Sequence, residues 1–156
     1  MKKKVIVAID GPSSSGKSTI AKLVAKHFNF TYIDSGSIYR VITYVAIKNN
    51  LIKTGNIDVV SLIDLLNNCS ISFSFNSNNQ NVIKLDDISV EDEIRTFEIS
   101  NNVSLIAEKN EIRKYVLKIQ KDISNNKSVV MDGRDIGSVV FPNADFKFFF
   151  GCINRC

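Results

Sequence analysis

The sequence predicts an α/β fold with a parallel core sheet flanked by helices and a small antiparallel β insert. Short β-branched runs alternate with stretches of helical periodicity, which is typical of strand–helix–strand units. The hydrophobic period also changes over residues 70–90, where a separate antiparallel element is expected. With 156 residues, 44% of them hydrophobic and 23% charged, the composition predicts one globular domain over residues 1–156.

The first elements follow directly from hydrophobic pattern. Residues 4–10 are short, apolar and bounded by glycine, so they predict a buried strand, and residues 30–33 predict a second. Helices are expected over 18–28 and 36–49, where apolar residues recur at helical spacing. The expected buried positions of these two helices are Ile20, Leu23, Val24 and Phe28, then Ile38, Val41, Ile42 and Val45.

The middle of the chain combines a helix with the insert. Asp58 is a possible cap for a helix over 59–66. Residues 70–90 contain an alternating strand, a polar turn at 76–81 and a return strand, so they predict an antiparallel hairpin.

The last third is expected to be helical first and extended afterwards. Residues 94–123 are predicted to be mostly helical. Residues 128–132 and 144–150 are apolar runs that predict two more buried strands. The core positions expected in the helical region are Val103, Ile106, Ile112, Val116 and Ile119.

The strongest motif is a phosphate loop between the first strand and the first helix. It fits G-x-x-x-x-G-K-[ST] in full, in the strand–loop–helix setting that the motif requires. Small residues let backbone amides point inward, Lys17 can neutralise the β- and γ-phosphates, and the Ser18 hydroxyl can ligate Mg²⁺. The predicted ATP-binding residues are Gly11, Pro12, Ser13, Ser14, Ser15, Gly16, Lys17, Ser18 and Thr19.

A first polar cluster follows the second strand. Ligands of open α/β sheets bind at the carboxyl ends of strands, so Ser35 and Arg40 are candidates to hold an acceptor phosphate. The alternative is a helix cap at Asp34 or Ser35 beside a solvent-facing arginine.

A second polar cluster follows the strand over 128–132. Asp132 closes that strand and is the expected magnesium partner, and Arg134 would face the same crevice. The alternative is an Asp/Gly turn with an arginine–aspartate ion pair. Only five of the twenty basic residues are arginines, which favours special roles for them.

Four segments together resemble the bacterial cytidylate kinase family: IDGPSSSGKST, YIDSGSIYR, EIRT at 93–96 and DGRDIGSVVFP. The resemblance covers residues 4–150 in unbroken order. It implies the nucleoside monophosphate kinase fold, with 70–90 as a CMP-binding insert. It also implies transfer of the γ-phosphate of ATP to CMP or dCMP. The motifs themselves predict that Ser18 and Asp132 hold the Mg²⁺.

The resemblance also assigns roles to single residues. Lys17, Arg134 and Asp132 would be catalytic. The residues that would bind the acceptor nucleotide are Ser35, Tyr39, Arg40, Ser104, Arg113, Arg134 and Asp135. From the residues alone, Ser104 and Arg113 would be interpreted as helix surface.

The family pattern stops at about residue 150. The family continues with an arginine-rich lid and a last strand and helix, whereas this chain continues as GCINRC. We therefore expect the lid and last strand to be missing, through a truncated or frameshifted gene or an incomplete chain.

Alternative functions remain open: another small P-loop kinase, or a nucleotide-binding remnant without turnover. The net charge of +4 is mild, and no run is long enough for a membrane span or signal peptide. We expect a cytoplasmic monomer that binds ATP, CMP and dCMP and has no nucleic-acid or membrane partner.

Overall fold

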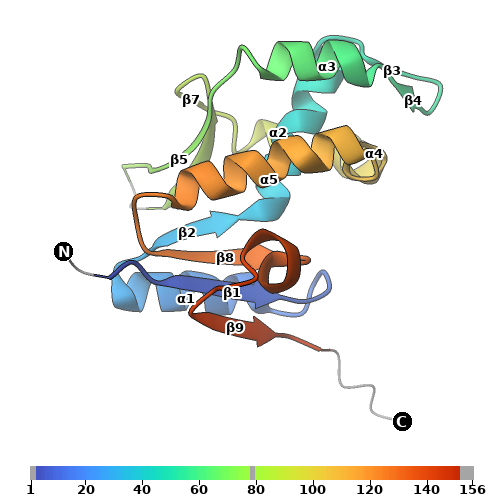
Figure 1. Cartoon of the computed structure of the whole chain (residues 1–156). Helices are drawn as coiled ribbons and strands as arrows, with labels where there is room; N and C mark the ends of the chain where they lie inside the picture. The colour runs from blue at the N-terminus through green and yellow to red at the C-terminus, as the bar shows by residue number, and fades with distance from the viewer. Residues whose placement is uncertain (1–2, 78–79, 152–156) are drawn as a thin grey trace. The chain divides into compact units, whose positions relative to one another are not determined.

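The computed structural model describes residues 3–77 and 80–151 (Figure 1). The chain divides into two compact units, Met1–Ser35 with Gln120–Cys156, and Gly36–Ile119. The expected tail after Gly151 lies outside the described residues. None of the helices in the described ranges is long and apolar enough to cross a membrane.

The first unit is built on a four-stranded sheet, as predicted. Its strands are β1 (Ile6–Asp10), β2 (Thr31–Asp34), β8 (Val129–Gly133) and β9 (Phe146–Phe149), in the order β2-β8-β1-β9 (Figure 1). All three strand pairs are parallel. Their carboxyl ends therefore meet at one edge, where Asp34 stands opposite Asp132.

Helix α1 (Lys17–Phe28) covers one face of this sheet, but it turns a different side to the core than the pattern predicts. Ala21 and Ala25 are its buried residues. Ile20, Leu23 and Phe28 are 40%, 59% and 58% exposed, so those core assignments are wrong. Alanine allows a helix backbone to lie close to the strands, whereas larger side chains at those positions would hold it away. The buried cluster beneath α1 comprises Val7, Ile9, Tyr32 and Val130.

Strand β9 also departs from expectation. The run 144–150 predicts a buried strand, yet all four residues of β9 are exposed. Phe146, Phe148 and Phe149 are 55%, 51% and 76% exposed. The reason is position rather than hydropathy, because among the described residues β9 pairs only with β1 and forms the edge of the sheet. Between β8 and β9 the chain forms a π-helical turn, η2 (Ile136–Val140), which no pattern predicts.

In its described residues, the second unit has four α-helices and two small antiparallel sheets. The helices are α2 (Ser35–Lys48), which begins at the last residue of the first unit, α3 (Val59–Leu66), α4 (Phe97–Ala107) and α5 (Asn110–Ser124), which ends in the first unit. The strands are β3 (Ile52–Lys53) with β4 (Asn56–Ile57), and β5 (Ile71–Phe75) with β6 (Asn81–Leu85) and β7 (Ile88–Ser89). The antiparallel insert is confirmed, with β7 as an additional short strand.

The hydrophobic core of this unit largely follows the predicted periodicity. All four apolar positions expected on α2 are buried, as are Ile106, Ile112 and Val116. Asp58 caps α3, because its Oδ1 accepts a hydrogen bond from the Ser61 amide at 3.1 Å. The expected helix over 94–123 is divided into a 3₁₀ turn, η1 (Glu93–Arg95), then α4 and α5. Thr96 starts α4 by accepting a hydrogen bond from the Ile99 amide, so this cap accounts for the break between η1 and α4.

Candidate phosphate-binding site

The phosphate loop joins the carboxyl end of β1 to the amino end of α1. Gly16 has φ 83°, a left-handed conformation that glycine adopts without strain, and α1 begins at the next residue. A Cβ on Gly11 would lie 2.6 Å from the carbonyl oxygen of Phe150, so only glycine fits there. The Lys17 ammonium donates to the Pro12 carbonyl at 3.0 Å. The positive end of the α1 dipole and this ammonium face the same loop, which favours an anion.

The Ser18 hydroxyl donates a hydrogen bond to Asp132 Oδ2 at 2.6 Å. Asp132 is only 2% exposed, and its Oδ1 has no hydrogen-bond partner among the described residues. Burial raises the pKa of Asp132, and the nearby Asp34 raises it further against the hydrogen bond from Ser18. A buried carboxylate with one open oxygen is costly on its own, and a bound cation would offset that cost.

Two further groups surround this carboxylate. Asp34 ends β2 directly opposite Asp132. Burial raises the pKa of the Tyr32 hydroxyl well above its usual value, and the carboxylates of Asp34 and Asp132 add to the effect. Tyr32 is therefore neutral at any ordinary pH. The Ser15 hydroxyl in the phosphate loop is a second buried polar group that has no partner within the described chain.

These oxygen groups fit Mg²⁺. This ion prefers oxygen ligands and usually combines one or two carboxylates with substrate phosphates and waters. In the described part of the chain, no group of three or more His, Cys, Asp or Glu side chains could hold a metal ion. A cation at Asp132 and Ser18 would thus need further ligands, which a triphosphate supplies.

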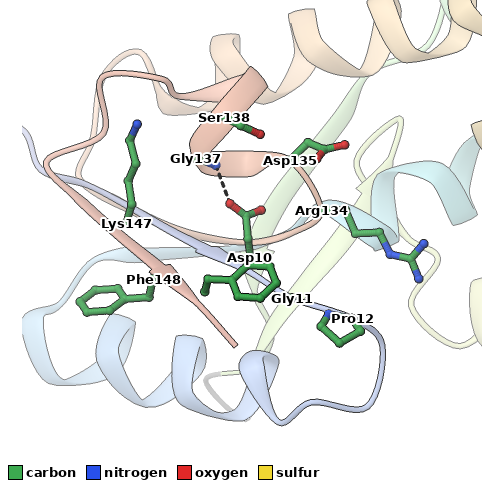
Figure 2. A pocket seen from close by; sticks show the side chains of 10 residues that line it. Asp10, Gly11, Pro12, Arg134, Asp135, Gly137, Ser138, Lys147 and Phe148 are labelled. Carbon is green, nitrogen blue, oxygen red and sulfur yellow. Dashed lines mark hydrogen bonds between the residues drawn. The ribbon is translucent and has the colours of Figure 1, made fainter. Parts of the chain in front are cut away.

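The loop that follows β8 carries Arg134 and Asp135, both exposed. The Arg134 guanidinium donates to the Ser13 hydroxyl of the phosphate loop at 3.4 Å. A Cβ on Gly133 would lie 2.0 Å from Ser35 Oγ, which shows how closely the ends of β8 and β2 approach. A pocket of about 690 Å³ opens beside this loop (Figure 2). Its lining includes Asp10, Gly11, Pro12, Arg134, Asp135, Gly137, Ser138, Lys147, Phe148 and Phe149.

The remaining candidates belong to the second unit. Arg40 donates to the Ile94 carbonyl at 3.2 Å and to the Ser100 hydroxyl at 3.1 Å, so its guanidinium is held near η1 and α4. Tyr39 packs against the core of this unit. Ser104 on α4 and Arg113 on α5 are exposed.

Comparison with known proteins identifies the family. The cytidylate kinase family profile matches residues 7–153. The chain belongs to the cytidylate kinase family. It is 42% identical over 147 residues to a cytidylate kinase of Streptococcus sanguinis (strain SK36), and 44% identical over 145 residues to one of Clostridioides difficile (strain 630).

These matches cover 94% and 93% of this chain, but 64% and 63% of the two cytidylate kinases. A cytidylate kinase of Streptococcus pneumoniae (serotype 19F, strain G54) is 44% identical over 147 residues, with 94% of this chain and 65% of that protein covered. The chain therefore spans just under two thirds of the length of these relatives.

Within the first unit, the structure brings several predicted residues of the cytidylate kinase motifs together. Ser18 contacts Asp132, Arg134 contacts Ser13, and Ser35 lies against Gly133. Tyr39, Arg40, Ser104 and Arg113 lie in the second unit. Their nucleotide contacts stay a prediction.

Sequence reasoning missed Asp10, and it treated Asp34 only as a possible helix cap. A signal for both was present, because an apolar residue followed by aspartate recurs at the carboxyl ends of three parallel strands. Ile9-Asp10 and Ile33-Asp34 end β1 and β2, and Met131-Asp132 lies one residue before the end of β8. The repeated pattern places a carboxylate at each carboxyl end along the edge where ligands of such sheets bind.

Proposed function

We propose that this chain, as part of a cytidylate kinase, phosphorylates CMP and dCMP with ATP. The observation that carries the proposal is the Ser18–Asp132 pair at the base of a complete phosphate loop, with a buried carboxylate oxygen left open. Membership of the cytidylate kinase family supports CMP as the acceptor. We also propose a cytoplasmic monomer.

On the donor side, the amides of residues 11–19 would hold the triphosphate while Lys17 neutralises its β- and γ-phosphates. Ser18 and Asp132 would hold Mg²⁺, which neutralises phosphate charge when bound. Because Asp132 is already fixed by Ser18 at 2.6 Å, little reorganisation is needed when ATP enters.

On the acceptor side, Arg134 and Arg40 are assigned to the phosphate of CMP. A guanidinium can hold two phosphate oxygens at once, which orients the acceptor as well as binding it. Ser35 and Tyr39 would shape that pocket, while Ser104, Arg113 and Asp135 would meet the cytosine ring. Transfer would then be in line and without a covalent enzyme intermediate, so the protein contributes positioning and charge neutralisation.

A panel of acceptors tests the proposal. ADP formation from ATP–Mg²⁺ is followed with CMP, dCMP, UMP and shikimate, and Lys17→Ala serves as the blank. CMP-dependent ADP formation above that blank, with less for UMP and shikimate, is the expected result. A preference for another acceptor would indicate a different small kinase. Nucleotide binding without any turnover would indicate a remnant.

Arg134→Lys separates the two sites. Lysine keeps the charge but cannot reproduce the bidentate fork at a phosphate, so CMP affinity should fall about 10-fold or more while ATP affinity changes little. Arg40→Lys should behave in the same way. Isothermal titration calorimetry measures both ligands. An equal loss for both ligands would contradict separate donor and acceptor roles.

A further inference from the structure

Asp10 occupies a junction between two loops of the first unit. It is the last residue of β1 and directly precedes Gly11, the first residue of the phosphate loop. It stands opposite Gly133, from which the Arg134 loop departs. The neighbouring Ile9 packs under α1, so the Asp10 side chain points to the other face of the sheet.

Both oxygens of Asp10 are used on the Arg134 loop. Asp10 Oδ1 accepts a hydrogen bond from the Ile136 amide at 2.6 Å. Its Oδ2 accepts one from the Gly137 amide at 2.8 Å, the contact drawn as a dashed line in Figure 2. These amides open the π-helical turn η2, and the first amides of a helical turn have no acceptor within it. The carboxylate therefore supplies the acceptors that fix where η2 begins.

The loop has the shape that this contact requires. A Cβ on Gly137 would lie 3.2 Å from Asp10 Oδ2 and 3.2 Å from Lys147 Cδ, so glycine admits the carboxylate. Asp135 has φ 58°, a left-handed conformation that aspartate tolerates better than most residues. This left-handed residue thus lies between Arg134 and the two amides held by Asp10.

We propose that Asp10 is a positioning residue that fixes the loop carrying Arg134 and Asp135 against the phosphate loop. The inference rests on the proposed function, in which Arg134 and Asp135 contact the acceptor nucleotide. Asp10 touches neither nucleotide in this assignment. It acts through the backbone at 136–137. Because Asp10 directly precedes Gly11, it also fixes the position of the Arg134 loop relative to the phosphate loop.

Two substitutions test this role. Asp10→Asn keeps the size of the side chain but leaves one acceptor oxygen for two amides, and Asp10→Ala removes both acceptors. Asp145→Asn is the matched control, because Asp145 also accepts from a backbone amide, that of Ile6 at 3.0 Å, at the opposite end of β1. Affinities for CMP and ATP–Mg²⁺ are measured by calorimetry, and backbone amide exchange and relaxation by NMR.

The expected result is a split between the two ligands. CMP affinity should fall about 10-fold in Asp10→Asn and further in Asp10→Ala, since hydrogen bonds to charged groups are the stronger ones. ATP affinity should stay within about threefold, and Asp145→Asn should change neither ligand. The amides of Ile136 and Gly137 should lose protection from exchange only in the Asp10 variants.

Equal losses for both ligands, or CMP affinity unchanged in both Asp10 variants, would overturn the proposal. If Asp10→Ala does not fold, Asp10→Asn decides alone. If the parent chain binds ATP but not CMP, the proposed function fails, and the NMR measurement still decides the role of Asp10. Faster exchange at 136–137 with new mobility at 134–135 supports it, and unchanged exchange overturns it.

Discussion

Lys17 is the residue on which ATP affinity should depend most. Its ammonium lies 3.0 Å from the Pro12 carbonyl, inside the loop that would hold the triphosphate. Lys17→Ala removes a compact charge and its donors, so ATP–Mg²⁺ affinity should fall about 100-fold or more. Calorimetry checks this, with Lys26→Ala as the control because Lys26 lies exposed in the last turn of the same helix. Unchanged affinity in Lys17→Ala would contradict the phosphate-loop assignment.

The carboxylate of Asp132 should lower the folding stability of the chain at neutral pH and should be needed for magnesium binding. Burial raises its pKa in the folded chain, so the folded state holds the proton more tightly than the unfolded state. Stability is therefore lost as pH rises from the unfolded pKa through the raised pKa, and the deficit persists at neutral pH. Asp132→Asn should raise the melting temperature at neutral pH, and this gain should vanish in acid below both pKa values. The same variant should lose the thermal shift produced by ATP–Mg²⁺.

Asp145→Asn is the control, because the pKa of Asp145 is lowered in the folded chain whereas that of Asp132 is raised. The amide of Ile6 and the side chain of Lys3 lower the pKa of Asp145, so its contribution is present above the unfolded pKa and lost as pH falls. This variant should not gain stability at neutral pH, and its response to ATP–Mg²⁺ should match that of the parent. A lower melting temperature for Asp132→Asn at neutral pH would contradict this prediction. It would show that the buried, charged carboxylate of Asp132 does not destabilise the folded state.

At the scale of elements, β9 is the exposed hydrophobic edge of the sheet within the described residues. Unpaired strand edges with apolar side chains promote pairing between molecules. Phe149 is the most exposed residue of β9, at 76%. In the chain of residues 1–156, Phe149→Glu should reduce aggregation during heating several-fold with little change in melting temperature, because a charge on an edge strand opposes further pairing. Light scattering measures the effect.

Phe97→Glu separates the edge from general hydrophobicity. Phe97 is 81% exposed, but it lies at the start of α4 and not on a sheet edge. This control should reduce aggregation less than Phe149→Glu. An equal or greater reduction would mean that exposed aromatic area, rather than the strand edge, drives association.

Elements defined by local pattern could be predicted, and those defined by distant contacts could not. The β-branched run of β1 and the helical spacing of apolar residues on α2 can each be recognised from the local sequence alone. Both elements are confirmed. The buried side of α1 was mistaken, because small alanines rather than the larger apolar residues face the sheet. Strands β3 and β4 are two residues each around the left-handed Thr54 and Gly55, too short for any period to show.

In the candidate site too, residues that are adjacent in the sequence could be predicted, and residues that depend on distant contacts could not. The phosphate loop is contiguous, so its residues could be predicted together. Asp10 was missed because its partners, the amides of Ile136 and Gly137, are 126 and 127 residues away in the sequence. Only the parallel pairing of β1 with β8 brings them within 3 Å. A strand-ending aspartate is visible in the sequence, but its acceptor role depends on the three-dimensional fold.

At the scale of the whole molecule, binding and turnover should separate. The groups proposed to bind ATP are all present in residues 11–19 and at Asp132. The family resemblance places an arginine-rich lid beyond the matching region, and its arginines would neutralise the charge that develops in the transition state. Only interactions that are stronger in the transition state than in the ground state raise kcat. The polypeptide of residues 1–156 should therefore bind ATP–Mg²⁺ yet turn over CMP well below the ordinary range of about 1–10³ s⁻¹.

A chimera gives this prediction its control. The polypeptide of residues 1–150 is joined to the part of the Streptococcus sanguinis cytidylate kinase that follows its matching region, and ADP formation with CMP is compared in both proteins. ATP affinity should agree within a few-fold, while turnover should rise about 10³-fold or more in the chimera, the scale on which arginine clamps act at a transferring phosphoryl group. Turnover of the 1–156 polypeptide in the ordinary range would contradict the prediction that binding and turnover separate. It would mean that groups already within these residues, with Arg134 beside Ser13 the foremost candidate, suffice for the transition state.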